Sequence, residues 1–91
     1  MNDRFDRLRE AIDANDRVII AAVNERLRLV AELWQLKREL GAERFDPDRE
    51  RTLRLELAAA NGGPLSATGL NRLVDEVLAL TKRELEGSDG R

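Results

Sequence analysis

Residues 3–40 read DRFDRLREAIDANDRVIIAAVNERLRLVAELWQLKREL and contain neither proline nor glycine. Apolar side chains recur in this segment at spacings of three, four and seven residues, which is typical of one face of an α-helix. The members of this apolar stripe are Phe5, Leu8, Ile12, Ile19, Ala22, Val23, Leu29, Val30, Leu33, Leu36 and Leu40. We therefore predict one continuous helix that ends at Gly41, because glycine readily adopts the left-handed conformation of a helix C-cap.

The predicted helix is too long for a single chain of 91 residues to cover. At 1.5 Å per residue it spans roughly 55 Å, well beyond the dimensions of a compact globule of this size. The sequence has no cysteine and no histidine, so disulfides and thiolate or imidazole metal sites are excluded as a means of stabilising a small core. Oligomerisation remains as a way to stabilise the fold, and we expect a partner chain to cover the rest of the helix.

Two shorter helices are predicted after the first. Asp46 is a suitable N-cap and Pro47 suits the first helical position, because proline has no N–H to leave unpaired. This second helix should end near Asn61, where the sequence NGGP interrupts it. Ser66 is placed to cap a third helix. The apolar face of this third helix comprises Leu70, Leu73, Val74, Val77, Leu78 and Leu85.

The expected fold class is therefore all-α, with one long and two shorter helices per chain, in a single domain of residues 1–91 whose last residues, 87–91, form a frayed tail. Sixteen basic and eighteen acidic residues give a net charge of -2, which argues against nucleic acid or an anionic membrane as a partner. The N-terminal segment is charged, and no run approaches the roughly 20 apolar residues of a membrane span. We expect a cytoplasmic protein in which any anion site is local.

Two cations, Arg26 and Lys37, interrupt the apolar stripe. They are eleven residues apart, about three helical turns, so they share one face at a separation of roughly 16 Å along the axis. Val30 and Leu33 lie between them. Such an arrangement suits a small dianion, with its charged ends paired and its body packed on aliphatic side chains. The alternative for either cation alone is a side chain that extends past the apolar seam into solvent.

Local sequence favours a structural interpretation for several other residues. Arg49 and Glu50 stand in the first turn of the second helix, where ion pairs and acidic residues are common. Arg9 lies among alternating charges and reads as a surface residue by local pattern. Thr81 interrupts the apolar face of the third helix and is expected to bond its hydroxyl to the preceding turn. Trp34 is expected in core or dimer packing.

The inventory of reactive groups limits the chemistry. The only serines, Ser66 and Ser88, lie in a cap and in the tail, so an activated nucleophile with a neighbouring base has no evident position. No glycine-rich phosphate loop of common spacing occurs. An enzyme with this inventory would act by positioning its substrate and by placing fixed charge where charge develops, which suits a unimolecular rearrangement.

The sequence resembles the small all-α chorismate mutases, which convert chorismate to prephenate, over about residues 5–85. The elements that carry the resemblance are LREAIDANDRVIIAAVNERLRLVAEL (8–33), the lysine of QLKRELG (35–41), FDPDRER (45–51) and NGGPLS (61–66). The resemblance implies an intertwined homodimer in which the long helices pair. It also implies an isomerase that uses no metal and no cofactor in phenylalanine and tyrosine synthesis.

The resemblance further implies roles for individual residues. Arg26 and Arg49 would bind the substrate carboxylates from one chain, and Arg9 would reach the site from the other chain. Lys37 would bind the ether oxygen of the breaking bond, where negative charge grows in the transition state. Glu50 would hold the ring hydroxyl. Lys37, Arg26 and Glu50 are thus the expected catalytic groups.

Four further positions complete the expected substrate-binding set. Asp46 matches an acidic position of the family, and Thr81 falls where serine is common. Four residues after that serine the family usually has glutamine or glutamate, whereas this chain has Leu85. The neighbouring Glu84 points about 100° away on a helix. Because the loss of one preorganised donor costs about 2.7 to 4 kcal/mol of barrier, we expect a mutase that is weak on its own.

Two alternatives to a chorismate mutase stay open from the sequence. The first is an isochorismate-pyruvate lyase, an enzyme that resembles the small chorismate mutases in its fold and in its cationic site. The second is a non-catalytic helical dimer that keeps the pocket as a sensor and regulates a shikimate-pathway partner enzyme. Leu85 favours this second alternative, because it stands where the family usually carries a catalytic donor.

Overall fold

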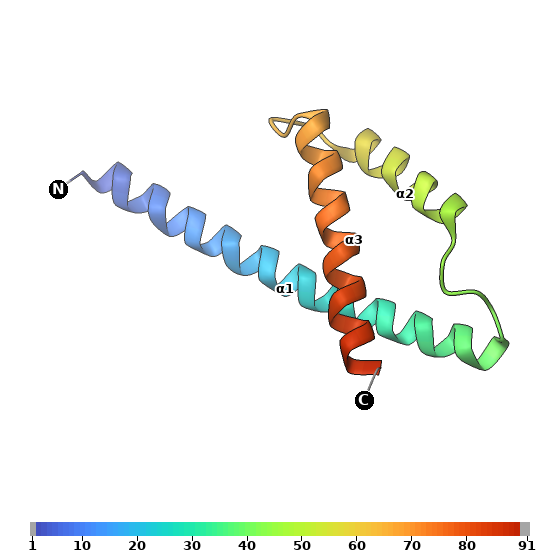
Figure 1. The fold of residues 1–91 in the computed structure, drawn as a ribbon. Coiled ribbons are helices and arrows are strands. Elements are labelled where there is room, and N and C mark those ends of the chain that lie inside the picture. Colours follow the sequence, from blue (N-terminus) through green and yellow to red (C-terminus); the bar gives the residue numbers. More distant parts are fainter. Residues whose placement is uncertain (1, 90–91) are drawn as a thin grey trace.

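The computed structural model describes residues 2–89, with side chains as far as residue 87. It contains three helices, α1 (Asp3–Leu40), α2 (Pro47–Ala60) and α3 (Ala67–Asp89), and no strand within the described residues (Figure 1). The all-α prediction is therefore confirmed, as is the division into one long and two shorter helices.

The bounds of α1 follow from its two caps. The Asn2 side chain accepts hydrogen bonds from the backbone N–H groups of Arg4 and Phe5, at 2.9 and 3.3 Å. At the other end Gly41 adopts a φ of 67°, and its N–H donates to the carbonyl of Arg38 at 3.3 Å. This left-handed C-cap is the one that the sequence predicts. With 38 residues, α1 is about 57 Å long, close to the 60 Å longest extent of the chain.

Local side-chain bonds also define the other two helices. The Asp46 carboxylate accepts from the backbone N–H of Arg49 at 3.1 Å, and Pro47 opens α2. The Ser66 hydroxyl accepts from the backbone N–H of Gly69 at 3.0 Å, ahead of α3. Both predicted N-caps are thus confirmed. α3 extends to Asp89, further than the expected frayed tail allows, and the rest of that tail, 90–91, lies outside the described residues.

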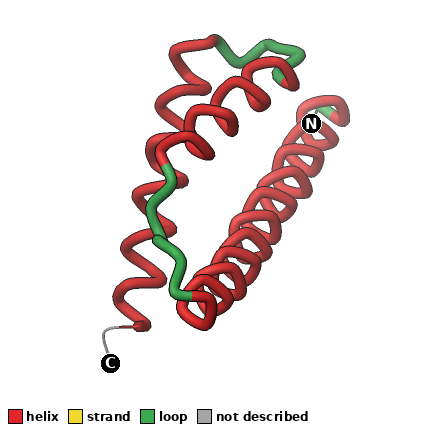
Figure 2. Tube along the Cα trace, turned by 90° about the vertical axis from the view of Figure 1, so that its right-hand side faces the viewer, coloured by secondary structure: helices red, strands yellow, loops and turns green. Residues whose placement is uncertain are grey.

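α3 holds the chain together. It contacts both α1 and α2, whereas α1 and α2 make no close backbone contact with each other in the described part of the chain. Figure 1 shows α3 crossing the C-terminal half of α1, while the N-terminal half of α1 projects away from the other helices. In the perpendicular view of Figure 2, the segment 41–46 leads from the end of α1 to α2.

A single chain buries very few of its described side chains. Among the described residues only Val74 and Thr81 are buried, with exposed fractions of 4% and 6%, and both lie on α3. The large apolar side chains of the α1 stripe, Phe5, Leu8, Ile12, Ile19, Leu29, Leu33, Leu36 and Leu40, are 48–72% exposed. The radius of gyration is 17.0 Å, against about 12 Å for a compact chain of this length. Most of the apolar stripe of α1 is therefore uncovered within its own chain, and only members such as Val23 and Val30 are half-buried.

The described helices include none that is long and apolar enough to cross a membrane.

Candidate functional site: a cationic cluster where three helices meet

Arg26 lies half-buried on α1, where α3 crosses it. Its Nη1 donates to the hydroxyl of Thr81 at 2.7 Å, across 55 positions of sequence. The Thr81 hydroxyl in turn donates to the carbonyl of Val77 at 2.7 Å, as the sequence predicts for a threonine on a helix. One hydroxyl thus both donates and accepts, and Arg26 is held in a fixed orientation by a neutral partner.

Arg49 brings a second cation to Arg26. The pKa of Arg26 is lowered, first because burial disfavours its charged form and second because the positive charge of Arg49 is close. Among the described residues Arg26 has no carboxylate partner. Arg49 is exposed and lies 3.7 Å from Glu56 of its own helix, rather than pairing with the acidic first turn. Two cations from different helices are therefore near enough for their charges to interact, an arrangement that suits the binding of an anion.

Lys37 lies half-buried in the last turn of α1, on the same face as Arg26 and roughly 16 Å along the axis. Its Nζ donates to the backbone carbonyl of Arg44 at 3.0 Å. The Arg44 guanidinium stacks over the Trp34 ring, with 3.8 Å between Cζ and the ring centroid. The segment after α1 therefore folds back over Lys37 and Trp34. The partner of Lys37 is an uncharged carbonyl, so its positive charge is not neutralised by that contact.

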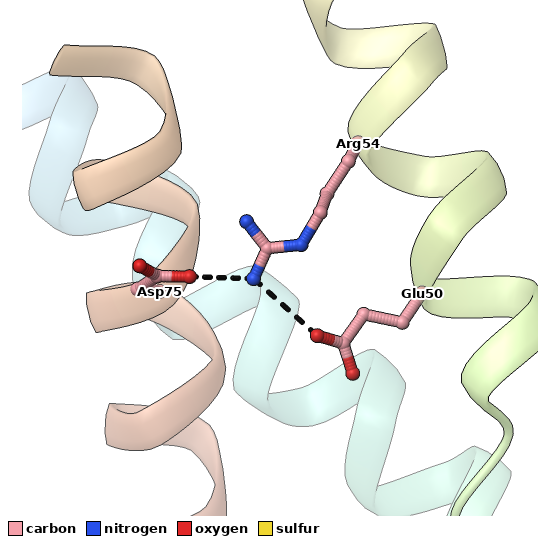
Figure 3. Close-up of polar contacts among 3 residues, drawn as sticks. All are labelled: Glu50, Arg54 and Asp75. Atoms are coloured by element: carbon pink, nitrogen blue, oxygen red, sulfur yellow. Dashed lines mark hydrogen bonds and ion pairs between the residues drawn. The ribbon is translucent and has the colours of Figure 1, made fainter. Parts of the chain in front are cut away.

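Glu50 points from α2 toward α3 (Figure 3). Its Oε1 lies 3.3 Å from Nη2 of Arg54, and the same nitrogen lies 2.5 Å from Oδ1 of Asp75 on α3. Arg54 and Asp75 were not predicted as neighbours of the site. The spacing of four residues between Glu50 and Arg54 was an available signal for their pairing, but nothing local pointed to Asp75.

The C-terminal candidates differ in exposure. Leu85 is half-buried, four residues after Thr81 and hence on the same face of α3. Glu84 is exposed. Glu84, three residues after Thr81, also lies near this face, but of the two only the apolar Leu85 is half-buried. Asp46 lies at the start of α2, where its carboxylate is engaged as the N-cap.

Arg9 is distant from the cluster within one chain. It precedes Arg26 by 17 residues of the same helix, which is about 25 Å along the axis, and its guanidinium stacks over the Phe5 ring at 4.4 Å. The structure thus brings Arg26 and Thr81 into contact, with the charge of Arg49 acting on Arg26, and leaves Arg9 on the projecting half of α1.

The described residues offer no competing site. No group of three or more acidic side chains that could hold a metal gathers within the described part of the chain. A shallow, mostly apolar hollow lies on the projecting half of α1. Its lining residues are Asp16, Arg17, Ile20, Ala21 and Asn24, none of which belongs to the predicted site.

Comparison with known proteins identifies the family. The sequence model described as chorismate mutase type II matches residues 8–86. The chain belongs to the chorismate mutase type II family. The match spans all three helices and includes every predicted site residue. The resemblance that the sequence motifs carry is thereby confirmed.

Solved structures agree with the family assignment. Form I of the chorismate mutase from Thermus thermophilus is 34% identical over 87% of this chain and 99% of that chain, with a TM-score of 0.81. Form II of the same protein is 33% identical over 92% of this chain and 96% of that chain, with a TM-score of 0.84. A search of curated proteins gives no significant match. The type II chorismate mutase fold is thus shared along nearly the whole length.

Proposed function

We propose that this protein is a chorismate mutase, an isomerase that rearranges chorismate to prephenate. The observation that carries the proposal is that Arg26, which is hydrogen-bonded to Thr81, feels the positive charge of Arg49, with no carboxylate paired to Arg26 among the described residues. Chorismate has two carboxylates, so this cluster supplies the complementary charge. Family membership and the two Thermus structures favour a mutase over an isochorismate-pyruvate lyase.

The proposed mechanism needs no co-reactant. In the pericyclic Claisen rearrangement the ether C–O bond breaks as a new C–C bond forms within one molecule. Arg26 and Arg49 clamp the carboxylates and hold the substrate in its folded, reactive shape. Lys37 stabilises the negative charge that develops on the ether oxygen. Glu50 accepts a hydrogen bond from the ring hydroxyl and so fixes the orientation of the ring.

The proposal includes a homodimer. The chain has an accessible surface of 7650 Å², whereas a folded monomer of its mass exposes about 5,400 Å². The excess of about 2,300 Å² per chain is of the size that obligate dimers bury. A second copy along the apolar stripe of α1 would cover this surface, and it would bring Arg9 of the partner subunit to the cationic cluster.

The cytoplasmic location expected from the sequence also stays a prediction.

Turnover of chorismate tests the proposal directly. The purified protein should convert chorismate to prephenate, and Arg26→Ala should reduce kcat/KM at least about 100-fold, because a preorganised charge is lost. Isochorismate should release no pyruvate. Pyruvate release would favour the lyase instead, and a folded dimer without any prephenate formation would contradict the proposal.

A non-catalytic sensor is the second candidate, and the half-buried Leu85 beside Thr81 favours it. A sensor would keep the cationic cluster without the donor that completes catalysis. Assays with and without shikimate-pathway enzymes separate the two candidates. Chorismate binding that is abolished by Arg26→Ala, but with no turnover in either setting, would support the sensor. Turnover that rises on addition of a partner enzyme would support a mutase that is weak on its own.

A further inference from the structure

One polar link joins α2 to α3, and it includes a residue of the proposed site. A single nitrogen of Arg54, Nη2, lies 2.5 Å from Oδ1 of Asp75 and 3.3 Å from Oε1 of Glu50. Figure 3 shows both α2 side chains pointing toward Asp75 on α3. Within the described residues this is the only ion pair between these two helices. The orientation of Glu50 is therefore tied to the packing of α2 on α3.

The contact between Arg54 and Glu50 is less exposed than an ordinary surface ion pair, which contributes little. The side chains of Arg54 and Glu50 are 29% and 37% exposed, whereas that of Asp75 is 64% exposed. The pKa of Arg54 is raised, chiefly because of its hydrogen bond to Asp75, so the guanidinium stays charged. The shorter bond anchors Arg54 to α3, and the longer one reaches back to the more enclosed carboxylate of Glu50.

We propose that Arg54 is a positioning residue that, anchored by Asp75, holds the Glu50 carboxylate in the orientation in which it meets the substrate. The inference rests on the proposed function, in which Glu50 accepts from the ring hydroxyl. Arg54 engages Oε1 of Glu50, and a carboxylate has a second oxygen with lone pairs for another donor. Without Arg54 the carboxylate would lose its fixed direction, and the substrate would be bound less tightly and less accurately.

The test is a double-mutant cycle between Arg54 and Glu50, measured as kcat/KM for chorismate. Arg54→Gln should lower kcat/KM about tenfold, a size typical of coupled neighbours, mainly through KM. Asp75→Asn should lower it in the same direction but less, and Arg54→Lys should recover part of the loss. In a Glu50→Gln background, Arg54→Gln should change kcat/KM by less than about twofold, because the group through which it acts is already altered.

Arg51→Gln is the matched control. Arg51 lies on the same helix and pairs with Asp48 of the first turn, but both side chains are largely exposed. Its replacement should leave kcat/KM within about twofold of the wild type, since surface substitutions have small effects. Thermal unfolding of each variant shows whether a loss of activity reflects a loss of fold.

Each outcome decides the inference. An Arg54→Gln variant as active as Arg51→Gln would overturn it while the mutase function stands. Effects of Arg54→Gln and Glu50→Gln that simply multiply would overturn it too, because Arg54 would then act elsewhere. If Arg54→Gln does not fold, Asp75→Asn carries the same cycle with Glu50→Gln. A wild-type dimer that makes no prephenate would refute the proposed function, and this inference with it.

Discussion

Arg26 occupies a position at which the pattern of α1 calls for an apolar side chain. Its guanidinium is half-buried, it donates to the neutral Thr81 hydroxyl, and it has Arg49 nearby. Removing a cation from water without an anionic partner costs free energy. A bound carboxylate would offset that cost, so the empty site is less stable than the occupied one.

Replacing Arg26 should therefore separate stability from function. We expect Arg26→Leu to leave the free energy of unfolding unchanged or raise it by about 1 kcal/mol, because a well-packed apolar residue replaces a desolvated charge. The same variant should lose chorismate turnover. Urea unfolding of wild type and variant at equal dimer concentration measures the difference. A variant clearly less stable than the wild type would show that Arg26 serves mainly to hold α1 against α3.

Leu85 gives the second prediction at the scale of single residues. Leu85→Gln introduces a donor four residues after Thr81, on the same face of α3. We expect kcat to rise at least about tenfold, because one preorganised donor is typically worth 10² to 10³ in kcat. The exposed Glu86→Gln is the control, and it should leave kcat unchanged. If Leu85→Gln has no effect on kcat, the last turns of α3 do not face the reacting ether oxygen.

The helices themselves could be predicted because their signals are local. Gly41, Asp46 and Ser66 each act within four residues of the helix end that they define. The pairing of Arg26 with Thr81 could not be predicted in this way, because it depends on where α3 crosses α1. The same holds for Arg54 and Asp75, on helices whose relative placement no periodicity encodes. Family resemblance, and not residue spacing, predicted roles for Arg49 and Arg9.

The N-cap of α2 connects element stability with the site. Asp46→Ala should lower the free energy of unfolding by about 1 kcal/mol, because the backbone N–H of Arg49 loses its partner. Chemical denaturation followed by circular dichroism measures the loss. Glu43→Ala, in the exposed segment before α2, is the control and should have no such effect. Equal stability of both variants would mean that the α2 cap contributes nothing to the fold.

At the scale of the whole molecule, the main feature is the exposed apolar stripe of α1. A chain of 10.3 kDa with this many exposed large apolar side chains on one helix supports the proposed homodimer, because large exposed apolar patches mark interfaces. The projecting half of α1 also carries Arg9. Assembly and catalysis should therefore be lost together.

Placing a charge in the apolar stripe of α1 tests whether assembly and catalysis are coupled. Ile12 is 58% exposed on the projecting half of α1. Ile12→Glu should shift the protein from a dimer to a monomer in light scattering and remove chorismate turnover, because a charge would be buried in the interface. Arg17→Glu, which changes charge on the polar side of the same helix, should keep the dimer. An active monomeric Ile12→Glu variant would refute the coupling between assembly and catalysis.

Subunit mixing tests most directly whether the two chains share each site. Arg9→Ala and Arg26→Ala each remove a cation from every site of their own homodimer and should be almost inactive. When the two variants are unfolded and refolded together in equal amounts, half of the dimers should be mixed, and each mixed dimer should contain one intact site. We predict recovery of about one quarter of wild-type activity. A mixture no more active than its parents, although mixed dimers form, would show that Arg9 does not complete the site of the partner subunit.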